Sequence, residues 1–204
     1  MNDICVALVI FRSWVGQVCD NQDRMVPWVR MAGQAGADVV CFPEMNISGY
    51  GIRSAAIMKS EPIPGPTSDR LSALATGEKI ANLAGMAEIN GAGLYASQIL
   101  ATPDGRIGVY RKLHIPPPEQ GIFSPADQVP VFQIKGVLCG VQLCYDSHFP
   151  ELSTHMAVKG ADVIFFPHAS PRGTPAEKYA SWMRYFLPNR RPDLYRSHYM
   201  EESA

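Results

Sequence analysis

The chain has 204 residues, of which 47% are hydrophobic and 18% are charged, and its formal net charge at pH 7 is −1. This is the composition of an ordinary soluble globular protein of about one domain, and the near-neutral charge gives no electrostatic argument for a nucleic-acid or membrane partner. No apolar run reaches the roughly 18 residues that a membrane span needs.

Cysteine usage and the amino terminus favour a reduced, cytoplasmic protein. The five cysteines are an odd number with no Cys-x-x-Cys pair, which is typical of a compartment that keeps thiols reduced. Residues 1–4 lack the basic start and apolar core of a signal peptide. The five histidines show no metal-ligand spacing with these cysteines, so we expect no metal site.

The first third of the chain predicts strands alternating with helices. A β-rich apolar run at residues 4–11 predicts a first strand, and residues 38–43 predict a second. Between them Asp20 can cap a helix over residues 21–34, with Pro27 in its first two turns, where proline is tolerated. A short helix is expected near residues 53–59, and Thr67 or Ser68 can cap another through Ala75.

The middle of the chain changes to a β pattern. Strands are predicted at residues 80–88, 94–102 and 107–112, joined by the hairpin signals Asn-Gly-Ala-Gly at 90–93 and Pro-Asp-Gly at 103–105. The triple proline at 116–118 predicts an extended loop that is neither helix nor central strand.

The last third returns to mixed strands and helices. Strands are predicted at residues 129–134, 137–143 and 162–166, with helices at 150–159 and from Thr174 towards Phe186. Residues 36–43 and 160–167 share the frame GADVxxFP, so we interpret them as two related helix–strand units in one domain. Helices interleaved with hairpins favour mixed sheets with helices outside.

Cys144 occupies the turn between a predicted strand and the helix that Pro150 begins. Open α/β sheets bind their ligands at such turns, and a thiol facing the positive end of a helix is favoured as thiolate. The alternative is a small core residue, because free cysteine is among the most buried residue types.

Glu44, Lys112 and Cys144 each lie where a predicted strand ends. Taken singly, a glutamate or a lysine at such a place is usually a solvated strand end. Together they have a chemical logic, because a carboxylate can take the thiol proton while an ammonium favours the thiolate and then stabilises an oxyanion.

Three segments around these residues, 42–44, 110–116 and 143–151, resemble in order the three signature segments of the nitrilase superfamily of carbon–nitrogen hydrolases. The resemblance extends from the first strand to about Arg184. It implies a four-layer α-β-β-α sandwich that is usually homo-oligomeric, with Glu44 as base, Lys112 as oxyanion stabiliser and Cys144 as nucleophile. It implies no metal or organic cofactor.

The implied reaction is hydrolysis of a small linear amide or N-carbamoyl compound through a thioester acyl-enzyme. True nitrilases of this superfamily tend to follow the cysteine with Trp-Glu, whereas this chain has Tyr145-Asp146, which favours an amide or carbamoyl substrate. Many amidase members carry a second glutamate shortly after the lysine. Glu119 is the candidate here, with a solvated loop charge as the alternative.

Four further residues are candidates for substrate binding: Tyr50, Tyr145, His168 and Arg172. The backbone N–H of Tyr145 is expected to help hold the oxyanion. Members that bind carbamoyl amino acids often have an arginine shortly after the cysteine, where this chain has Ser147-His148. Arg172 could clamp an anion instead, although an exposed loop arginine is equally consistent with its position.

The resemblance ends near the carboxyl terminus, so we divide the chain into an incomplete hydrolase domain at residues 1–184 and an atypical tail at 185–204. The tail is Arg-rich, broken by proline and without a strand pattern, and it resembles a truncated or frame-shifted end. We therefore expect the final strands of the sandwich to be missing. The alternative function is that of a catalytically impaired relative acting only as a folded or partner-binding module.

Overall fold

The computed structural model describes residues 3–51, 57, 59–169 and 198–201. Its helices are α1 (Val18–Gln34), α3 (Pro66–Glu78) and α4 (Pro150–Val158), with short 3₁₀ helices η1 (Pro117–Glu119) and η2 (Cys144–His148). Its strands are β1 (Val6–Ile10), β2 (Val39–Cys41), β3 (Ala81–Asn90), β4 (Gly93–Ala101), β5 (Ile107–Arg111), β6 (Phe132–Ile134), β7 (Val137–Val141), β8 (Val163–Phe165) and β9 (His198–Glu201).

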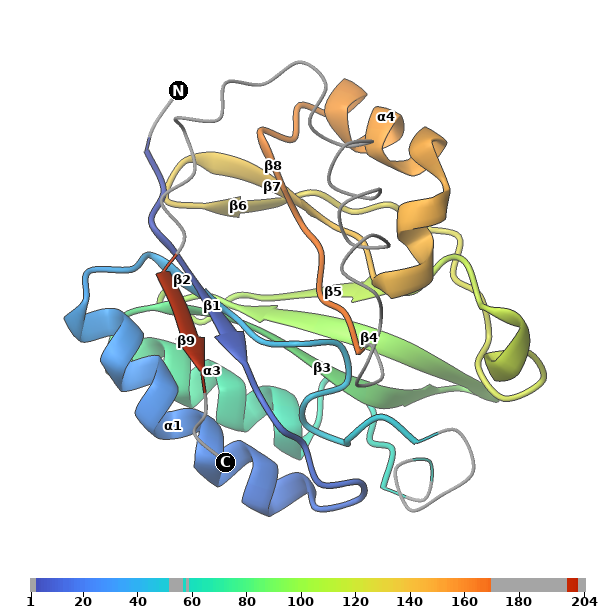
Figure 1. Cartoon of the computed structure of the whole chain (residues 1–204), viewed down its shortest axis with the longest axis horizontal. Coiled ribbons are helices and arrows are strands. Elements are labelled where there is room, and N and C mark those ends of the chain that lie inside the picture. Colours follow the sequence, from blue (N-terminus) through green and yellow to red (C-terminus); the bar gives the residue numbers. More distant parts are fainter. Residues whose placement is uncertain (1–2, 52–56, 58, 170–197, 202–204) are drawn as a thin grey trace.

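Two sheets lie between helices and form the predicted four-layer sandwich (Figure 1). The larger sheet has the strand order β5-β4-β3-β2-β1-β9, and the smaller has the order β6-β7-β8. Helices α1 and α3 cover the outer face of the larger sheet, and α4 covers the outer face of the smaller one (Figure 1). The fold therefore agrees with the expected α-β-β-α class.

The molecule has one apolar core between the larger sheet and its helices and another between the two sheets. Side chains of the central strands alternate between these two cores. Val40 packs with the buried faces of α1 and α3, while its neighbours Val39 and Cys41 pack between the sheets against Val141. Successive side chains of a strand point to opposite faces, so a strand buried on both faces is apolar at every position. This explains why the predicted strand at residues 38–43 has no polar alternation.

The predicted hairpin at residues 90–93 is confirmed: Asn90 pairs with Gly93, leaving a two-residue turn. Gly91 has a φ of +59°, which the tight turn requires. The repeated GADVxxFP frame also has a structural counterpart. Both β2 and β8 follow a helix and pair in parallel with a central strand of their own sheet, β1 and β7 respectively.

Helix α1 begins earlier than predicted. Its first residue is Val18 and its N-cap is Gln17, which makes no side-chain cap, so the prediction of Asp20 as the cap was wrong. Asp20 lies in the first turn, where its charge favours the helix dipole. Pro27 consequently lies in the helix interior, where it leaves the carbonyl of Asp23 without a helical donor. Both residues are exposed, so solvent can satisfy that carbonyl.

Two other local predictions need correction. The N-cap of α3 is Gly65 rather than Thr67 or Ser68, and the Ser68 hydroxyl accepts a hydrogen bond of 2.8 Å from the Gly65 N–H. The proline-rich loop contains the 3₁₀ helix η1, although no helix was expected there. Proline is compatible with the first turn of a helix because the N–H that it lacks would have no helical acceptor.

The prediction that the tail contains no strand was wrong for residues 198–201. Strand β9 pairs in parallel with β1, over Ala7↔His198 to Ile10↔Glu201. An open sheet edge offers a complete row of backbone partners, and that pairing outweighs the weak local β pattern. The predicted helix from Thr174 lies outside the described residues, as does most of the predicted helix at residues 53–59. Within the described chain, none of the helices has the length and apolar character to cross a bilayer.

Candidate active site

Glu44, Lys112 and Cys144 come from three strand ends in two sheets. Glu44 follows β2 and Lys112 directly follows β5 in the larger sheet, whereas Cys144 follows β7 in the smaller one. The two sheets face each other, so these ends meet between them. Glu44 and Lys112 are buried, and Cys144 is partly buried.

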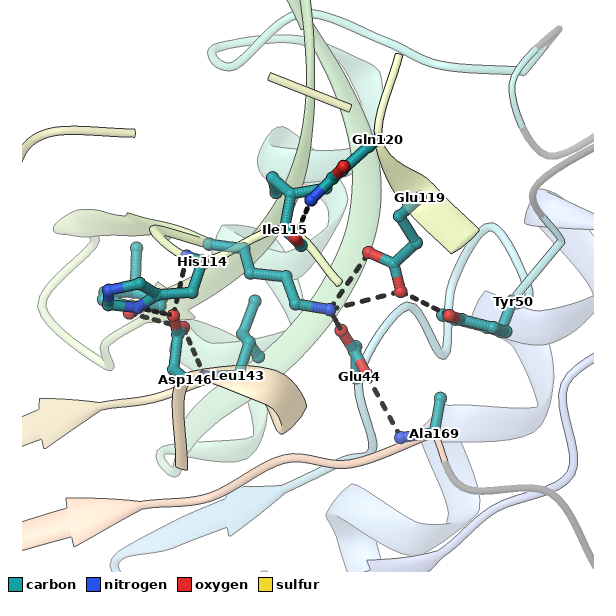
Figure 2. Close-up of polar contacts among 11 residues, drawn as sticks. Glu44, Tyr50, His114, Ile115, Glu119, Gln120, Leu143, Asp146 and Ala169 are labelled. Carbon is teal, nitrogen blue, oxygen red and sulfur yellow. Dashed lines mark hydrogen bonds and ion pairs between the residues drawn. The ribbon is translucent and has the colours of Figure 1, made fainter. Parts of the chain in front are cut away.

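Lys112 is fully buried and lies between two carboxylates. Its ammonium donates to Glu44 Oε1 at 2.8 Å and to the two oxygens of Glu119 at 3.1 and 3.3 Å. Figure 2 shows Glu44 and Glu119 converging from separate segments. Burial disfavours the lysine charge, but the charges of Glu44 and Glu119 outweigh burial and raise the pKa of Lys112.

Glu44 is a buried carboxylate with an elevated pKa. Burial raises the pKa of Glu44 and the nearby Glu119 charge adds to the effect, while the ion pair with Lys112 opposes it. The second oxygen of Glu44 accepts a hydrogen bond of 3.2 Å from the backbone N–H of Ala169 (Figure 2). A carboxylate whose protonated form is favoured in this way is better suited to hold and return a proton than an exposed one.

Cys144 has a left-handed backbone with a φ of +43°, and it begins η2. This conformation is costly for a residue with a side chain and is typical of functional sites. Its backbone N–H donates to the Pro167 carbonyl at 3.1 Å, which ties the turn to the segment after β8.

The thiol of Cys144 is neutral at rest, which corrects the expectation of a thiolate. Burial raises the pKa of Cys144 to about 12, and the Glu44 charge raises it further than Lys112 lowers it. Helix α4 begins only at Pro150, so η2 separates the cysteine from the helix dipole that was expected to stabilise a thiolate.

Glu119 is buried beside Lys112, so the alternative of a solvated loop charge was wrong. It lies at the end of η1, within the loop that the prolines form. The hydroxyl of Tyr50 donates to Glu119 (Figure 2). The two carboxylates and Tyr50 thus form one connected polar chain through Lys112.

A cavity of about 800 Å³ lies beside these polar residues, with Glu44 and Tyr50 in its wall. The described residues that line it are mostly apolar: Leu8, Val9, Ile10, Phe11, Ser13, Cys41, Phe42, Pro43, Glu44, Tyr50, Phe166, Pro167, His168 and Ala169. His168 is mostly buried, and burial, with smaller effects of Lys112 and His148, lowers its pKa to about 4. The ring of Tyr145 packs beside Phe149, and Arg172 lies outside the described residues.

The chain after Glu44 is held against β3 by a close backbone approach. Gly85 donates to the Asn46 side chain at 2.8 Å and accepts from Ile47 at 2.9 Å. A Cβ on Gly85 would lie 2.4 Å from the backbone nitrogen of Met45, so only glycine fits there. Met45 itself has a φ of +53°, and Glu44 is thereby set on a sharp turn.

Sequence reasoning missed a second polar cluster beside the site. The carboxylate of Asp146 is fully buried and accepts hydrogen bonds from Tyr110, His114 and Leu143. Its position two residues after the cysteine was visible in the sequence, but its partners Tyr110 and His114, at the end of the other sheet, were not. Among the described residues, no three His, Cys, Asp or Glu side chains are grouped so as to hold a metal ion.

The comparison with protein families matches residues 5–191 to the carbon–nitrogen hydrolase family. Among curated proteins, the chain is 35% identical over 166 residues to a nitrilase of Pyrococcus abyssi, covering 79% of this chain and 63% of the relative. It is 35% identical over 127 residues to an (R)-stereoselective amidase of a Pseudomonas species, covering 62% and 46%. It is 33% identical over 170 residues to N-carbamoylputrescine amidase of Solanum lycopersicum, covering 76% and 56%.

Solved structures share the fold. Saccharomyces cerevisiae Nit3, a nitrilase-superfamily protein, superposes with a TM-score of 0.80 at 26% identity, covering 89% of this chain and 70% of that one. XC1258 of Xanthomonas campestris gives a TM-score of 0.78 at 22% identity, covering 91% and 71%. The chain spans about half to two thirds of the length of the curated relatives named above.

Proposed function

This chain belongs to the carbon–nitrogen hydrolase family, and we propose on that basis that it hydrolyses a small linear amide or N-carbamoyl compound through a thioester on Cys144. Two groups of observations support the proposal. The relatives include an amidase and a carbamoyl amidase, and the site combines a thiol, a carboxylate with an elevated pKa and a buried ammonium.

The single observation that carries the mechanism is the buried pair of Glu44 and Lys112, whose Oε1 and Nζ atoms lie 2.8 Å apart and whose charges both act on the Cys144 thiol. Because the thiol is neutral at rest, attack on a carbonyl needs a base in contact with it. Glu44 is that base: it takes the thiol proton as sulfur bonds to the carbonyl carbon. A base with an elevated pKa can also return the proton, which the next step requires.

Lys112 stabilises the negative charge that develops on the carbonyl oxygen. An ammonium has three N–H donors, so two can serve Glu44 and Glu119 while the third reaches the oxyanion. We assign a second donor to the backbone N–H of Tyr145, which has no helical acceptor at the start of η2. Each such donor is worth about 3–4 kcal/mol in the transition state.

Collapse of this intermediate breaks the carbon–nitrogen bond and completes the cycle. Protonated Glu44 gives its proton to the leaving nitrogen, releasing an amine or ammonia and leaving the acyl group on sulfur. Water then attacks the thioester while Glu44 takes its proton, and the Cys144 sulfur leaves and is reprotonated. Glu119 keeps Lys112 charged and in place through both halves.

The substrate class rests on two observations. The Tyr145-Asp146 pair after the cysteine departs from the Trp-Glu pair expected of true nitrilases, although one relative is named a nitrilase. The described cavity lining is mostly apolar, and Glu44 is its one formally charged member among the residues that the structure describes. We therefore propose that the part of the substrate that lies beside Glu44 in this cavity is apolar or neutral.

Ammonia release from matched amides, carbamoyl amines and nitriles tests the proposal directly. We expect turnover of an amide or carbamoyl compound, none by Cys144→Ala, and an acyl adduct on Cys144 detectable by mass spectrometry after acid quenching. A folded protein that turns over nothing in the panel would favour a non-catalytic, partner-binding role. Turnover that survives Cys144→Ala would eliminate the thioester mechanism.

Assembly and cellular location stay predictions from the family resemblance and the cysteine usage. We propose a homo-oligomer in the cytoplasm, tested by light scattering of the purified protein and by fractionation of the source cells. A monodisperse monomer would contradict the first part.

A further inference from the structure

The buried carboxylate of Asp146 connects the two strand ends that carry Lys112 and Cys144. Its Oδ2 accepts from the Tyr110 hydroxyl at 2.7 Å and from the Leu143 N–H at 3.0 Å. Its Oδ1 accepts from the N–H of His114 at 2.9 Å and from its ring Nδ1 at 2.8 Å. The backbone N–H groups of Leu143 and His114 can only donate, so each oxygen of Asp146 accepts at least one hydrogen bond.

The partners of Asp146 flank the two reacting residues in sequence. Tyr110 and His114 lie two residues before and two after Lys112, and Leu143 directly precedes Cys144. Tyr110 and Lys112 share one face at the end of β5 because side chains alternate along a strand. Figure 2 shows Asp146 contacting His114 and Leu143 beside the carboxylates of the site.

A ring contact reinforces the same connection. The His114 ring stacks on Phe149, with centroids 3.6 Å apart and planes within 7° of parallel. Phe149 ends η2, and its backbone N–H donates to the Asp146 carbonyl at 3.1 Å. The segment after Lys112 is thus attached to both ends of the cysteine turn, through Leu143 at its start and Phe149 at its end.

We propose that Asp146 is a positioning residue, which fixes the Cys144 turn of the smaller sheet against the Lys112 end of the larger sheet. The proposal rests on the proposed function for its effect on turnover. Asp146 touches no reacting atom. It acts through Leu143, Tyr110 and His114, and it sets the placement of the thiol relative to Glu44 and Lys112. A misplacement of about 1 Å in such a site can cost on the order of 100-fold in rate.

The test combines turnover with alkylation of Cys144 by iodoacetamide in a Cys19→Ser background, since Cys19 is exposed. In Asp146→Asn, one acceptor oxygen becomes an NH₂ group. That group then faces either the donors of Tyr110 and Leu143 or the backbone and ring nitrogens of His114. We expect turnover to fall by about 100-fold. We expect Cys144 labelling at pH 8–9 to rise at least about tenfold, because a displaced thiol escapes the burial and the Glu44 charge that keep it protonated.

Cys139 provides an internal control because it is buried in the core between the sheets and does not line the cavity. A displaced turn leaves Cys139 protected, whereas general loosening of the fold exposes Cys139 and Cys144 together. If labelling of Cys139 rises in parallel with that of Cys144, Asp146 is merely structural. Unchanged turnover and unchanged Cys144 labelling in a folded Asp146→Asn protein would also overturn the proposal.

Two further variants keep the test decisive. Tyr110→Phe removes one hydrogen bond to Asp146 without adding a charge, and it is expected to change turnover and Cys144 labelling in the same directions but less. Glu88→Gln alters another buried carboxylate, which binds Arg111 on the opposite face of β5. It is expected to lower stability without accelerating Cys144 labelling, and acceleration there would refute a specific role for Asp146.

The two proposals fail in different ways. If wild-type protein hydrolyses no compound in the panel, the proposed function fails while the labelling measurements still decide on Asp146. If the wild type is active and Asp146→Asn matches it in turnover and labelling, only the positioning role is lost.

Discussion

At the scale of single residues, the site is an excess of buried negative charge around one ammonium. Glu44 and Glu119 both contact Lys112, and all three side chains are at most 1% exposed. Burying one charge without compensation is expensive, and an ion pair with good geometry only offsets that cost. The second carboxylate raises the pKa of Glu44 and favours the protonated form of Lys112, which is consistent with the proposed chemistry.

We predict that Lys112→Met lowers the free energy of unfolding by about 3–5 kcal/mol, because it leaves two buried carboxylates without their cation. Adding Glu119→Gln should recover part of the stability, as measured by urea unfolding at pH 7. It should recover none of the activity, as measured by ammonia release. A single variant as stable as wild type would show that the carboxylates are satisfied without Lys112.

We predict that Glu44→Gln loses about 100- to 10,000-fold in kcat/KM, the usual contribution of a general base. The amide oxygen can still accept from Lys112, so the melting temperature should stay within a few degrees of wild type. Glu61→Gln is the matched control, because Glu61 accepts only from the Thr67 N–H near the start of α3 among its described side-chain contacts. Activity within about tenfold of wild type, near 1.4 kcal/mol, would remove Glu44 from the mechanism.

At the scale of elements, close approach between β3 and the chain after β2 sets the position of Glu44. We predict that Gly85→Ala costs about 1–3 kcal/mol, because its Cβ would overlap the backbone of Met45 and the side chain of Gln98. Displacing Met45 also displaces Glu44, so turnover should fall more than stability alone explains.

The matched control for this substitution is Gly77→Ala in α3, where an added Cβ meets nothing within 4 Å. Alanine in a helix is preferred over glycine by up to about 1 kcal/mol, so this variant should be neutral or more stable. Equal losses of stability and turnover in the two variants would mean that the contact with Met45 does not matter.

Strands could be predicted from the sequence where an apolar, β-rich run was bounded by clear turn residues. The hairpin β3–β4 has a turn signal between two long apolar strands, and Glu44, Lys112 and Cys144 could each be placed at a strand end. Features set by tertiary contacts could not be predicted. The neutral state of the thiol depends on burial beside Glu44, and Asp146 has partners up to 36 residues away in sequence.

At the scale of the whole molecule, the candidate active site lies where two separately hydrogen-bonded sheets meet. Glu44 and Lys112 belong to one sheet, whereas Cys144, Asp146 and His168 lie at strand ends of the other. Their spacing therefore depends on the apolar core between the sheets, in which Leu83 and Leu100 of one sheet pack with Val137 and Val141 of the other. Stability and catalytic geometry are coupled through this core.

His168, which follows β8 at the candidate site, makes folding stability depend on pH in the acid range. The pKa of His168 is lowered to about 4 by burial, with Lys112 and His148 adding to the effect, from an ordinary value of 6.5. As pH falls below about 6.5, the unfolded chain binds a proton at this histidine that the folded protein does not. Folding stability is therefore lost between about pH 6.5 and 4, by at most roughly 3–4 kcal/mol from this group.

We predict that His168→Gln shows a flatter stability profile than wild type between pH 7 and 4, measured by urea unfolding at half-unit intervals. The comparison isolates this histidine, because Glu44 has an elevated pKa and titrates with the opposite sign in both proteins. Above pH 7 the two profiles should run parallel, since neutral histidine and glutamine then carry the same charge. Parallel profiles of the two proteins throughout the acid range would mean that His168 has the same pKa in the folded protein as in the unfolded chain. The ring would then reach solvent at the wall of the cavity.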